Sequence, residues 1–254
     1  MKRLPRQYSG FTLVELAIVL FIVSLLIGGL LMPLSAQYEV RGRQETDRAL
    51  TNIREALLGF AIVNGRLPCP ADPSIATGAA NAGVEQRSGT GPTPHDNVCT
   101  FATGVLPWAT LGLPETDAWN NRFSYRATST FSRGVDSAPT TTSAYGAGCA
   151  LTAVADMPTR SAFALCTQGD IAIKVSAGGI DLATAIPAIV VSHGKNGLGA
   201  YRTDGIQISG AAGDELENAN GDTTFVRSSE IDDLVMWLPT SVLMGRMLAA
   251  GRLP

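Results

Sequence analysis

The sequence predicts an α+β protein in which one long N-terminal helix packs on a small antiparallel β-sheet with long loops. Three observations lead to this prediction. Residues 11–32 form an apolar run of 22 residues that contains one charged side chain. Residues 35–64 carry apolar side chains at three- and four-residue spacing, which is typical of an amphipathic helix. Beyond position 70, short apolar runs alternate with stretches rich in Gly, Pro, Ser and Thr, as in strands joined by loops.

Composition excludes several classes of protein. The 254-residue chain is 45% hydrophobic and 16% charged, and so holds less charge than the roughly 25% of an average soluble protein. The formal charge is −3, and Lys2, Arg3 and Arg6 place +3 on the first ten residues, which leaves −6 on the other 244. DNA binding requires Lys and Arg that neutralise phosphates. We therefore expect no nucleic-acid partner.

The first element expected is a membrane-spanning helix over 11–34, preceded by a basic leader peptide over 1–10. A membrane helix needs about 20 mostly apolar residues, and the N-terminal run supplies them. A cleaved secretory signal is the alternative, but its apolar core has only about 7–15 residues and ends in an Ala-x-Ala-like site. The run is too long for this, and residues 33–38 are a poor cleavage site. We expect the span to remain in the mature chain.

Glu15 is the charged residue within the apolar run. An acidic side chain in a membrane span is costly and by default indicates a functional partner. Glu15 lies near the start of the run, where its carboxylate can also reach the membrane surface without a partner. If the chain is cut after Gly10, the new ammonium of Phe11 lies one helical turn away, and a neighbouring subunit offers the same group. Opposite charges attract strongly in a medium of low dielectric.

The helix is expected to continue over 35–64 as an amphipathic segment that ends at Asn64-Gly65, where prolines follow. Its apolar stripe covers too few heptads for a coiled coil. We expect the stripe to pack on a globular β-rich domain over 65–254. Strands are predicted at 122–126, 162–166, 170–175 and 186–191, and loops at 71–100, 128–148 and 209–224.

All four cysteines lie after the expected membrane span, at Cys69, Cys99, Cys149 and Cys166. An even number of cysteines in an oxidising compartment indicates disulfides, and four cysteines permit three connectivities. We predict the pairing of sequence neighbours, Cys69–Cys99 and Cys149–Cys166. A zinc site is the alternative, but neither a Cys-x-x-Cys pair nor a nearby histidine supports it.

The sequence contains no recognisable catalytic motif. The two histidines, His95 and His193, accompany neither a Gly-x-Ser-x-Gly pattern nor a metalloprotease pattern. A Walker motif and a dinucleotide fingerprint are also absent from the sequence. We therefore do not expect an enzyme.

The N-terminus resembles a known processing signal. The basic leader, the segment Ser9-Gly10-Phe11-Thr12-Leu13-Val14-Glu15 and the long apolar run are similar to the class III signal of type IV pilins and type II secretion pseudopilins. This resemblance implies cleavage after Gly10 by a prepilin peptidase, N-methylation of Phe11, and pairing of Glu15 with the N-terminus of an adjacent subunit. It also implies a single-pass inner-membrane protein with a periplasmic C-terminal domain, which can be extracted into a periplasmic or surface filament.

Other stretches are similar to the major pseudopilin of type II secretion. Residues 117–125 are similar to its Asp-Pro-Trp-Gly-Asn-Pro-Tyr signature, and residues 192–197 and 232–237 are similar to its C-terminal loop. That loop binds calcium in the family, so the resemblance implies a structural calcium ion, for which oxygen ligands are needed. A metal-free loop is the alternative. The expected ligands are Asp232, Asp233, Asn196 in place of a family aspartate, and a residue of 204–222.

Three functions are compatible with these features. The first is a pilin-like structural subunit, a pseudopilin or minor pilin, that assembles through its N-terminal helix. The second is a pilin-like binding or adhesion module that presents its loops to a surface ligand or DNA, and the acidic charge disfavours DNA. The third is a membrane-anchored periplasmic enzyme. We expect the first, with prepilin peptidase, other pilin or pseudopilin subunits and the inner membrane as partners, and the large domain favours a minor role.

Overall fold

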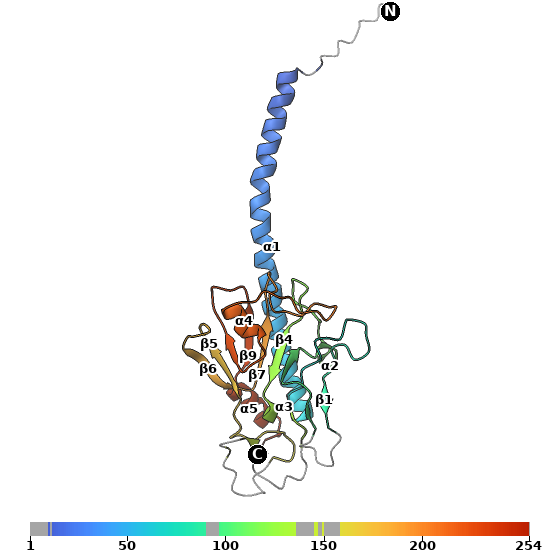
Figure 1. Cartoon of the computed structure of the whole chain (residues 1–254), viewed down its shortest axis with the longest axis vertical. Coiled ribbons are helices and arrows are strands. Elements are labelled where there is room, and N and C mark those ends of the chain that lie inside the picture. The colour runs from blue at the N-terminus through green and yellow to red at the C-terminus, as the bar shows by residue number, and fades with distance from the viewer. Residues whose placement is uncertain are drawn as a thin grey trace, which may run out of the picture. The chain divides into compact units, whose positions relative to one another are not determined.

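The computed structural model describes residue 10 and residues 12–89, 97–135, 145–146, 149 and 158–253, and for residues 28–36 it describes the backbone alone. The chain divides into two compact units, Met1–Gly42 and Arg43–Pro254, which are drawn in Figure 1. The expected leader, apart from Gly10, lies outside the described residues, as does Phe11.

Helix α1, Leu13–Asn64, begins in the first unit and ends in the second, and it confirms the long helix that the sequence predicts. Within the described residues, none of the helices combines the length and the hydropathy that a membrane span requires. The predicted span 11–34 includes Phe11 and side chains of residues 28–34, which lie outside that description.

The second unit contains a four-stranded antiparallel sheet with the order β3-β4-β7-β9. Tyr125 of β4 pairs with Val190 of β7, and Val190 pairs in turn with Met236 of β9. Every residue of β7 is buried, so this strand lies in the middle of the unit (Figure 1). The strands are β3, Thr103–Val105; β4, Ser124–Ala127; β7, Ala188–Ser192; and β9, Leu234–Leu238.

One face of this sheet packs against helices. Leu50, Ile53 and Leu57 of α1 share a hydrophobic core with Val190 of β7. Helix α5, Thr240–Ala249, contributes buried side chains to the same core. These contacts explain the apolar stripe of the sequence: its side chains are removed from water by packing on the sheet, which stabilises the fold by roughly 1.5–3 kcal/mol for each large side chain that is fully buried.

The other face packs against a second sheet with the order β6-β5-β8. Ile189 and Val191 point from β7 into a core that they share with Ile171, Ile173 and Phe225. This sheet is mixed, because β5 pairs with β6 in antiparallel and with β8 in parallel orientation, whereas the sequence led us to expect one antiparallel sheet. Its strands are β5, Ile171–Lys174; β6, Asp181–Ile186; and β8, Thr224–Val226.

Short elements complete the second unit. They are the antiparallel ribbon of β1, Arg87–Ser88, and β2, Val98–Cys99, and the helices α2, Trp108–Leu111; α3, Ser129–Ser132; and α4, Asp214–Ala219. Thus parts of the segments predicted as loops are ordered secondary structure. The α+β class, the N-terminal helix and antiparallel pairing are confirmed.

Two strand predictions need correction. Residues 162–166 form bends and a turn. The Ala162 carbonyl oxygen accepts hydrogen bonds from the Arg133 guanidinium at 3.0 and 2.8 Å, and the Ala162 N–H donates to the Gly65 carbonyl at 2.8 Å. The backbone groups of Ala162 therefore bond to partners outside any β-ladder. The predicted strand 186–191 is divided at Pro187, where the chain passes from β6 in one sheet to β7 in the other.

Candidate functional site

Gly10, the residue before the predicted cleavage point, makes no contact with the described residues that would require a glycine. It is exposed, and a Cβ added to it meets no atom within 4 Å. Its backbone also lies outside the positive-φ region that favours glycine. Packing against the described residues therefore does not require glycine at this position.

Helix α1 begins with a reciprocal cap between Thr12 and Glu15. The Thr12 N–H and hydroxyl both donate to Glu15 Oε2 at 2.9 Å, and the Glu15 N–H donates to the Thr12 hydroxyl oxygen at 3.3 Å. This is the capping-box arrangement, whose sequence signature is Ser/Thr-x-x-Glu/Gln. This role of Glu15 was not among the expectations from the sequence, although the Thr-x-x-Glu spacing is a signal for it.

The first turns of α1 carry a large exposed apolar surface. Leu13 is 86% exposed, Val14 68% and Phe21 67%. Exposed apolar side chains continue along this part of the helix, at Leu16, Ile18, Val19, Leu20, Ile22, Val23, Leu25, Leu26 and Ile27. Apolar surfaces of this extent mark sites where a protein or a membrane binds.

The structure places three of the expected calcium ligands together. The Asn196 N–H donates to Asp232 Oδ2 at 2.8 Å, and the Asn196 side-chain amide donates to Glu215 Oε1 at 2.5 Å. Glu215 belongs to the segment 204–222, from which a further ligand was expected. Asp233 turns instead toward Asn218, whose amide donates to its Oδ2 at 2.8 Å.

Two buried carboxylate oxygens at this site, Asp232 Oδ1 and Asp233 Oδ1, accept no hydrogen bond. Orphaned buried oxygens of this kind are compatible with an ion, because a cation would satisfy them. Among the described residues, however, no three His, Cys, Asp or Glu side chains are close enough to share a metal ion. The described residues therefore place carboxylate oxygens here but do not form a closed metal cage.

His193 is fully buried beside this site. Its Nε2 lies 2.8 Å from the Ser124 hydroxyl, while its Nδ1 lies 3.9 Å from Asp233 Oδ2 and has no hydrogen-bond partner. Burial lowers the pKa of His193 to about 4, so the ring is neutral at pH 7. Burial also raises the pKa of Asp233 to about 7. A serine nucleophile needs a base that a third group orients by a hydrogen bond, and 3.9 Å is too long for that bond.

A pocket of about 420 Å³ opens beside Ser124. Its walls include aromatic rings and amide side chains, from Phe101, Tyr201, Gln207, Asn218 and Asn220. Such groups can bind small polar ligands.

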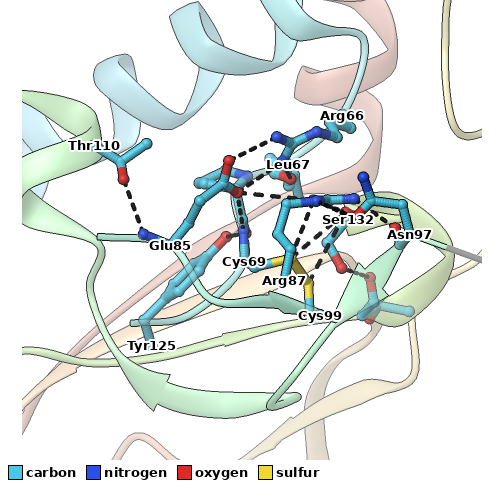
Figure 2. The surroundings of a disulfide bond; sticks show 12 residues. Arg66, Leu67, Cys69, Glu85, Arg87, Asn97, Cys99, Thr110, Tyr125 and Ser132 are labelled. Carbon is cyan, nitrogen blue, oxygen red and sulfur yellow. Dashed lines mark hydrogen bonds and ion pairs between the residues drawn. A yellow bond between two sulfur atoms is a disulfide. The ribbon is translucent and has the colours of Figure 1, made fainter. Parts of the chain in front are cut away.

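Both disulfides join sequence neighbours. Cys69 is bonded to Cys99 and Cys149 to Cys166, with Cα–Cα distances of 5.2 and 4.9 Å. Figure 2 shows the surroundings of the first bond, which connects the segment after α1 to strand β2. Long-range polar contacts surround it, and none of them is predicted from the sequence.

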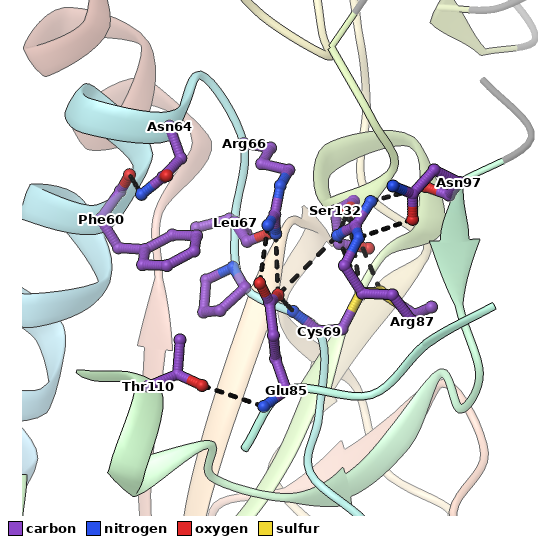
Figure 3. A network of polar contacts seen from close by, with 12 residues as sticks. Phe60, Asn64, Arg66, Leu67, Cys69, Glu85, Arg87, Asn97, Thr110 and Ser132 are labelled. Carbon is purple, nitrogen blue, oxygen red and sulfur yellow. Dashed lines mark hydrogen bonds and ion pairs between the residues drawn. A yellow bond between two sulfur atoms is a disulfide. The ribbon is translucent and has the colours of Figure 1, made fainter. Parts of the chain in front are cut away.

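Glu85 is the centre of these contacts. The Arg66 guanidinium donates to its two carboxylate oxygens at 2.7 and 2.8 Å, and the Cys69 N–H donates at 2.9 Å. Arg87 Nη1 lies 3.8 Å away, as Figure 3 shows. Burial alone would raise the pKa of Glu85, but the hydrogen bonds from Arg66 and Cys69 and the charges of Arg66 and Arg87 outweigh it and hold this pKa below its ordinary value.

A comparison with known families identifies the N-terminal segment. Residues 5–31 match the model of the prokaryotic N-terminal methylation motif, which is the signature of type IV pilins and pseudopilins. The match includes Gly10, Phe11 and Glu15, and residues 32–254 lie outside it. No curated protein and no solved structure matches the chain significantly.

Proposed function

We propose that this chain is a pilin-like structural subunit, a pseudopilin or a minor pilin. A prepilin peptidase cleaves it after Gly10, and the subunit then assembles through its N-terminal helix into a type II secretion pseudopilus or a type IV pilus. The N-terminal methylation motif at residues 5–31 is the observation that carries this proposal. The exposed apolar surface at the start of α1 supports it, because assembly through this helix would bury that surface.

Glu15 acts in assembly by attracting the N-terminus of an adjacent subunit. Its capping contacts with Thr12 support this role, because they hold the carboxylate beside the first turn of the helix. Cleavage creates an ammonium at Phe11 in every subunit, and an incoming subunit in the correct register pairs it with Glu15. A subunit in the wrong register leaves a buried charge without a partner, which is unfavourable. The pair therefore selects the axial register.

Residues 11–34 anchor the subunit in the inner membrane, and residues 65–254 lie in the periplasm. The apolar composition of the N-terminal run supports the anchor. The two disulfides support an oxidising compartment for the C-terminal part.

Labelling of an introduced cysteine by a membrane-impermeant maleimide tests this topology. A cysteine placed at Ser209 should be labelled in intact spheroplasts. Failure of the maleimide to label this cysteine there would contradict the orientation.

Calcium is the structural ion that we propose for the C-terminal loop. Asp232 and Asp233 supply the buried oxygens that have no hydrogen-bond partner, and Asn196 and Glu215 lie beside Asp232. A hard cation takes six to eight oxygen ligands, so backbone carbonyls and water would complete the set. When bound, the ion would tie the 192–197 loop to the segment before β9.

Mass spectrometry of the mature protein tests the processing. We expect residues 11–254 with one methyl group on the Phe11 nitrogen. Cells that lack the prepilin peptidase provide the control and should yield the intact chain. Gly10→Ala should accumulate uncleaved, and since the alanine meets no atom of the described residues, the defect would reflect recognition by the peptidase. A Met1 start in peptidase-positive cells, or cleavage near Ala36, would contradict the proposal.

A pilin-like adhesion module is the second candidate, because of the pocket beside Ser124. In that case the pocket binds a small polar surface ligand while the helix still assembles. Ala219→Trp, at a residue that lines the pocket, should abolish adhesion of the cells and leave incorporation into filaments unchanged. Normal adhesion of this variant would exclude the pocket as the ligand site.

A further inference from the structure

The two sulfur atoms of the Cys69–Cys99 bond have different surroundings (Figure 2). Cys69 is fully buried, whereas Cys99 is partly exposed on the β1–β2 ribbon. The Ser132 carbonyl oxygen lies 3.8 Å from Cys69 Sγ and 3.9 Å from Cys99 Sγ, so this group does not distinguish them. Arg87 does, because its Nη1 donates to Cys69 Sγ at 3.2 Å.

The Arg87 guanidinium is fixed in this position (Figure 3). Its Nε and Nη2 donate to the side chain and the carbonyl of Asn97 at 2.8 and 2.6 Å, and its Nη1 also donates to the Ser132 carbonyl at 2.9 Å. Arg87 is also the cross-strand partner of Cys99. Its side chain is 15% exposed, so little water screens the charge from the sulfur.

The local charge favours an anion at Cys69. Arg66 and Glu85 form a fork-to-fork ion pair and neutralise one another, which leaves the charge of Arg87 in excess in this group of three side chains. An adjacent Arg stabilises a thiolate, while burial disfavours it. The hydrogen bond from Arg87 therefore offsets the burial of Cys69, the sulfur that solvent cannot reach.

We propose that this disulfide is a directional thiol–disulfide exchange site, in which Cys99 receives the external sulfur and Cys69 is the thiolate that attacks or leaves. The external reagent is a small disulfide or a protein of the thiol–disulfide oxidoreductase class, written R–S–S–R. This site consists of Cys69, Cys99 and Arg87 and is independent of the function proposed for the N-terminal helix.

Closure then proceeds in two balanced steps. The Cys99 thiolate attacks R–S–S–R, which forms Cys99–S–S–R and releases R–S⁻. The Cys69 thiolate next attacks Cys99 Sγ, so that the Cys69–Cys99 bond forms and a second R–S⁻ leaves. The two cysteines are oxidised and R–S–S–R is reduced to two thiolates, which take protons from solvent. In the reverse direction R–S⁻ attacks Cys99 Sγ, and Cys69 leaves as a thiolate held by Arg87.

The position of attack can be measured on the unmodified full chain in detergent micelles. Brief exposure to reduced glutathione, acid quenching, labelling with N-ethylmaleimide and peptide mapping would locate each adduct. We expect glutathione on Cys99 and maleimide on Cys69 in at least tenfold excess over the opposite arrangement. An equal distribution, or glutathione mainly on Cys69, would overturn the proposal.

The rate of opening separates a chemical role of Arg87 from a purely structural one. Arg87→Gln removes the charge beside the leaving sulfur and should slow opening about tenfold, because a less stabilised thiolate leaves more slowly. Arg87→Lys keeps a positive charge but lacks the planar guanidinium. Its rate of opening should lie between those of the unmodified chain and of Arg87→Gln. If Arg87 only supported the fold, its loss would loosen the ribbon and speed opening, and that result would overturn the proposal. Lys174→Gln, which removes an ion pair with Asp181 on the second sheet, is the matched control and should change the rate less than twofold.

Discussion

Glu15 and Glu85 are both carboxylates that accept several hydrogen bonds, but their partners differ in distance along the chain. Glu15 bonds to Thr12, three residues away, and stays exposed. Glu85 bonds to Cys69 and Arg66, which are 16 and 19 residues away. Local bonds form in any chain that makes this helix, whereas those of Glu85 require the folded second unit. The contacts of Glu85 therefore belong to the folded second unit, whereas Glu15 is exposed and bonds within the first turn of its own helix.

The largest expected effect comes from Glu15→Val. If Glu15 pairs with an ammonium of an adjacent subunit, the variant should be expressed, cleaved and disulfide-bonded normally, while its incorporation into filaments falls about a hundredfold because a buried charge loses its partner. Quantitative immunoblotting of sheared filaments against total cell protein would measure this ratio.

Glu15→Gln is the control that separates capping from pairing. Glutamine retains the capping box but has no charge to attract an ammonium. We therefore expect Glu15→Gln to fail in incorporation as Glu15→Val does. Normal incorporation of the glutamine variant would show that the cap, and not an ion pair, is what assembly requires.

Glu85→Gln should destabilise the fold, unlike the Glu15 variants, and leave processing of the N-terminus unchanged. Removing one partner of a buried ion pair destabilises a protein by about 3–5 kcal/mol, and since the Glu85 side chain is 14% exposed we expect about 3 kcal/mol. Denaturant titration of the full chain in detergent, followed by Trp fluorescence, would measure the change in the free energy of unfolding. Cleavage and methylation at Phe11 should be unaffected. A Glu85→Gln variant as stable as the unmodified chain would contradict the conclusion that Glu85, unlike Glu15, stabilises the fold.

The features that the sequence predicted well are the ones that local patterns determine. The long apolar run and the stripe after it fixed α1, and the motif around Gly10 and Glu15 was recognisable because its residues are adjacent. The contacts of Arg66, Glu85 and Arg87 could not be predicted from the sequence. Nothing in the spacing of these residues indicates that folding brings them to one disulfide.

The predictions from the sequence that were wrong or missing also have their cause in contacts between residues far apart in the chain. The segment 162–166 has strand-like composition, but its backbone groups bond to Arg133 and Gly65, which only the tertiary structure brings near. The parallel pairing of β5 with β8 joins residues about 50 positions apart in the chain, and hydrophobic alternation contains no information on orientation. The proximity of Asn196 to Glu215 also depends on folding, and the acidic residues of 204–222 indicated only that one of them was a candidate.

Calcium should stabilise the second unit without affecting the first. A ligand that binds only the folded state at about 100 times its Kd adds roughly 2.7 kcal/mol. Melting of the full chain in detergent at pH 8, with calcium or with EDTA, would measure this difference. Magnesium at the same concentration is the control, because it demands a stricter octahedral geometry. A melting temperature that does not respond to millimolar calcium would leave Asp232 and Asp233 as loop residues.

The smallest predicted effect is the pH dependence of that calcium response. Burial, together with the charges of Asp232 and Glu215, raises the pKa of Asp233 to about 7 against the hydrogen bond from Asn218. Calcium binds the ionised carboxylate, so protons compete with it. From pH 8 to pH 6.5 the ionised fraction of Asp233 falls about fourfold, and at a fixed, near-saturating calcium concentration the stabilisation should fall by about 0.8 kcal/mol.

In EDTA, the free energy of unfolding should depend on pH with the opposite sign to the calcium response. A carboxyl whose pKa is higher in the folded state than in the unfolded one stabilises the fold at low pH, and this contribution is lost as the pH rises through about 7. Burial lowers the pKa of His193 to about 4 in the folded state, against about 6.5 when unfolded. Its contribution therefore rises by about 0.4 kcal/mol from pH 6.5 to 8, which offsets about half of the decrease of about 0.8 kcal/mol that Asp233 causes. Stability in EDTA should therefore decrease from pH 6.5 to 8 while the added stabilisation by calcium increases. Asp233→Asn should remove the pH trend of the calcium response and leave only the slight rise in EDTA that His193 causes. A calcium response that is unchanged across this range in the unmodified chain would exclude Asp233 as a ligand.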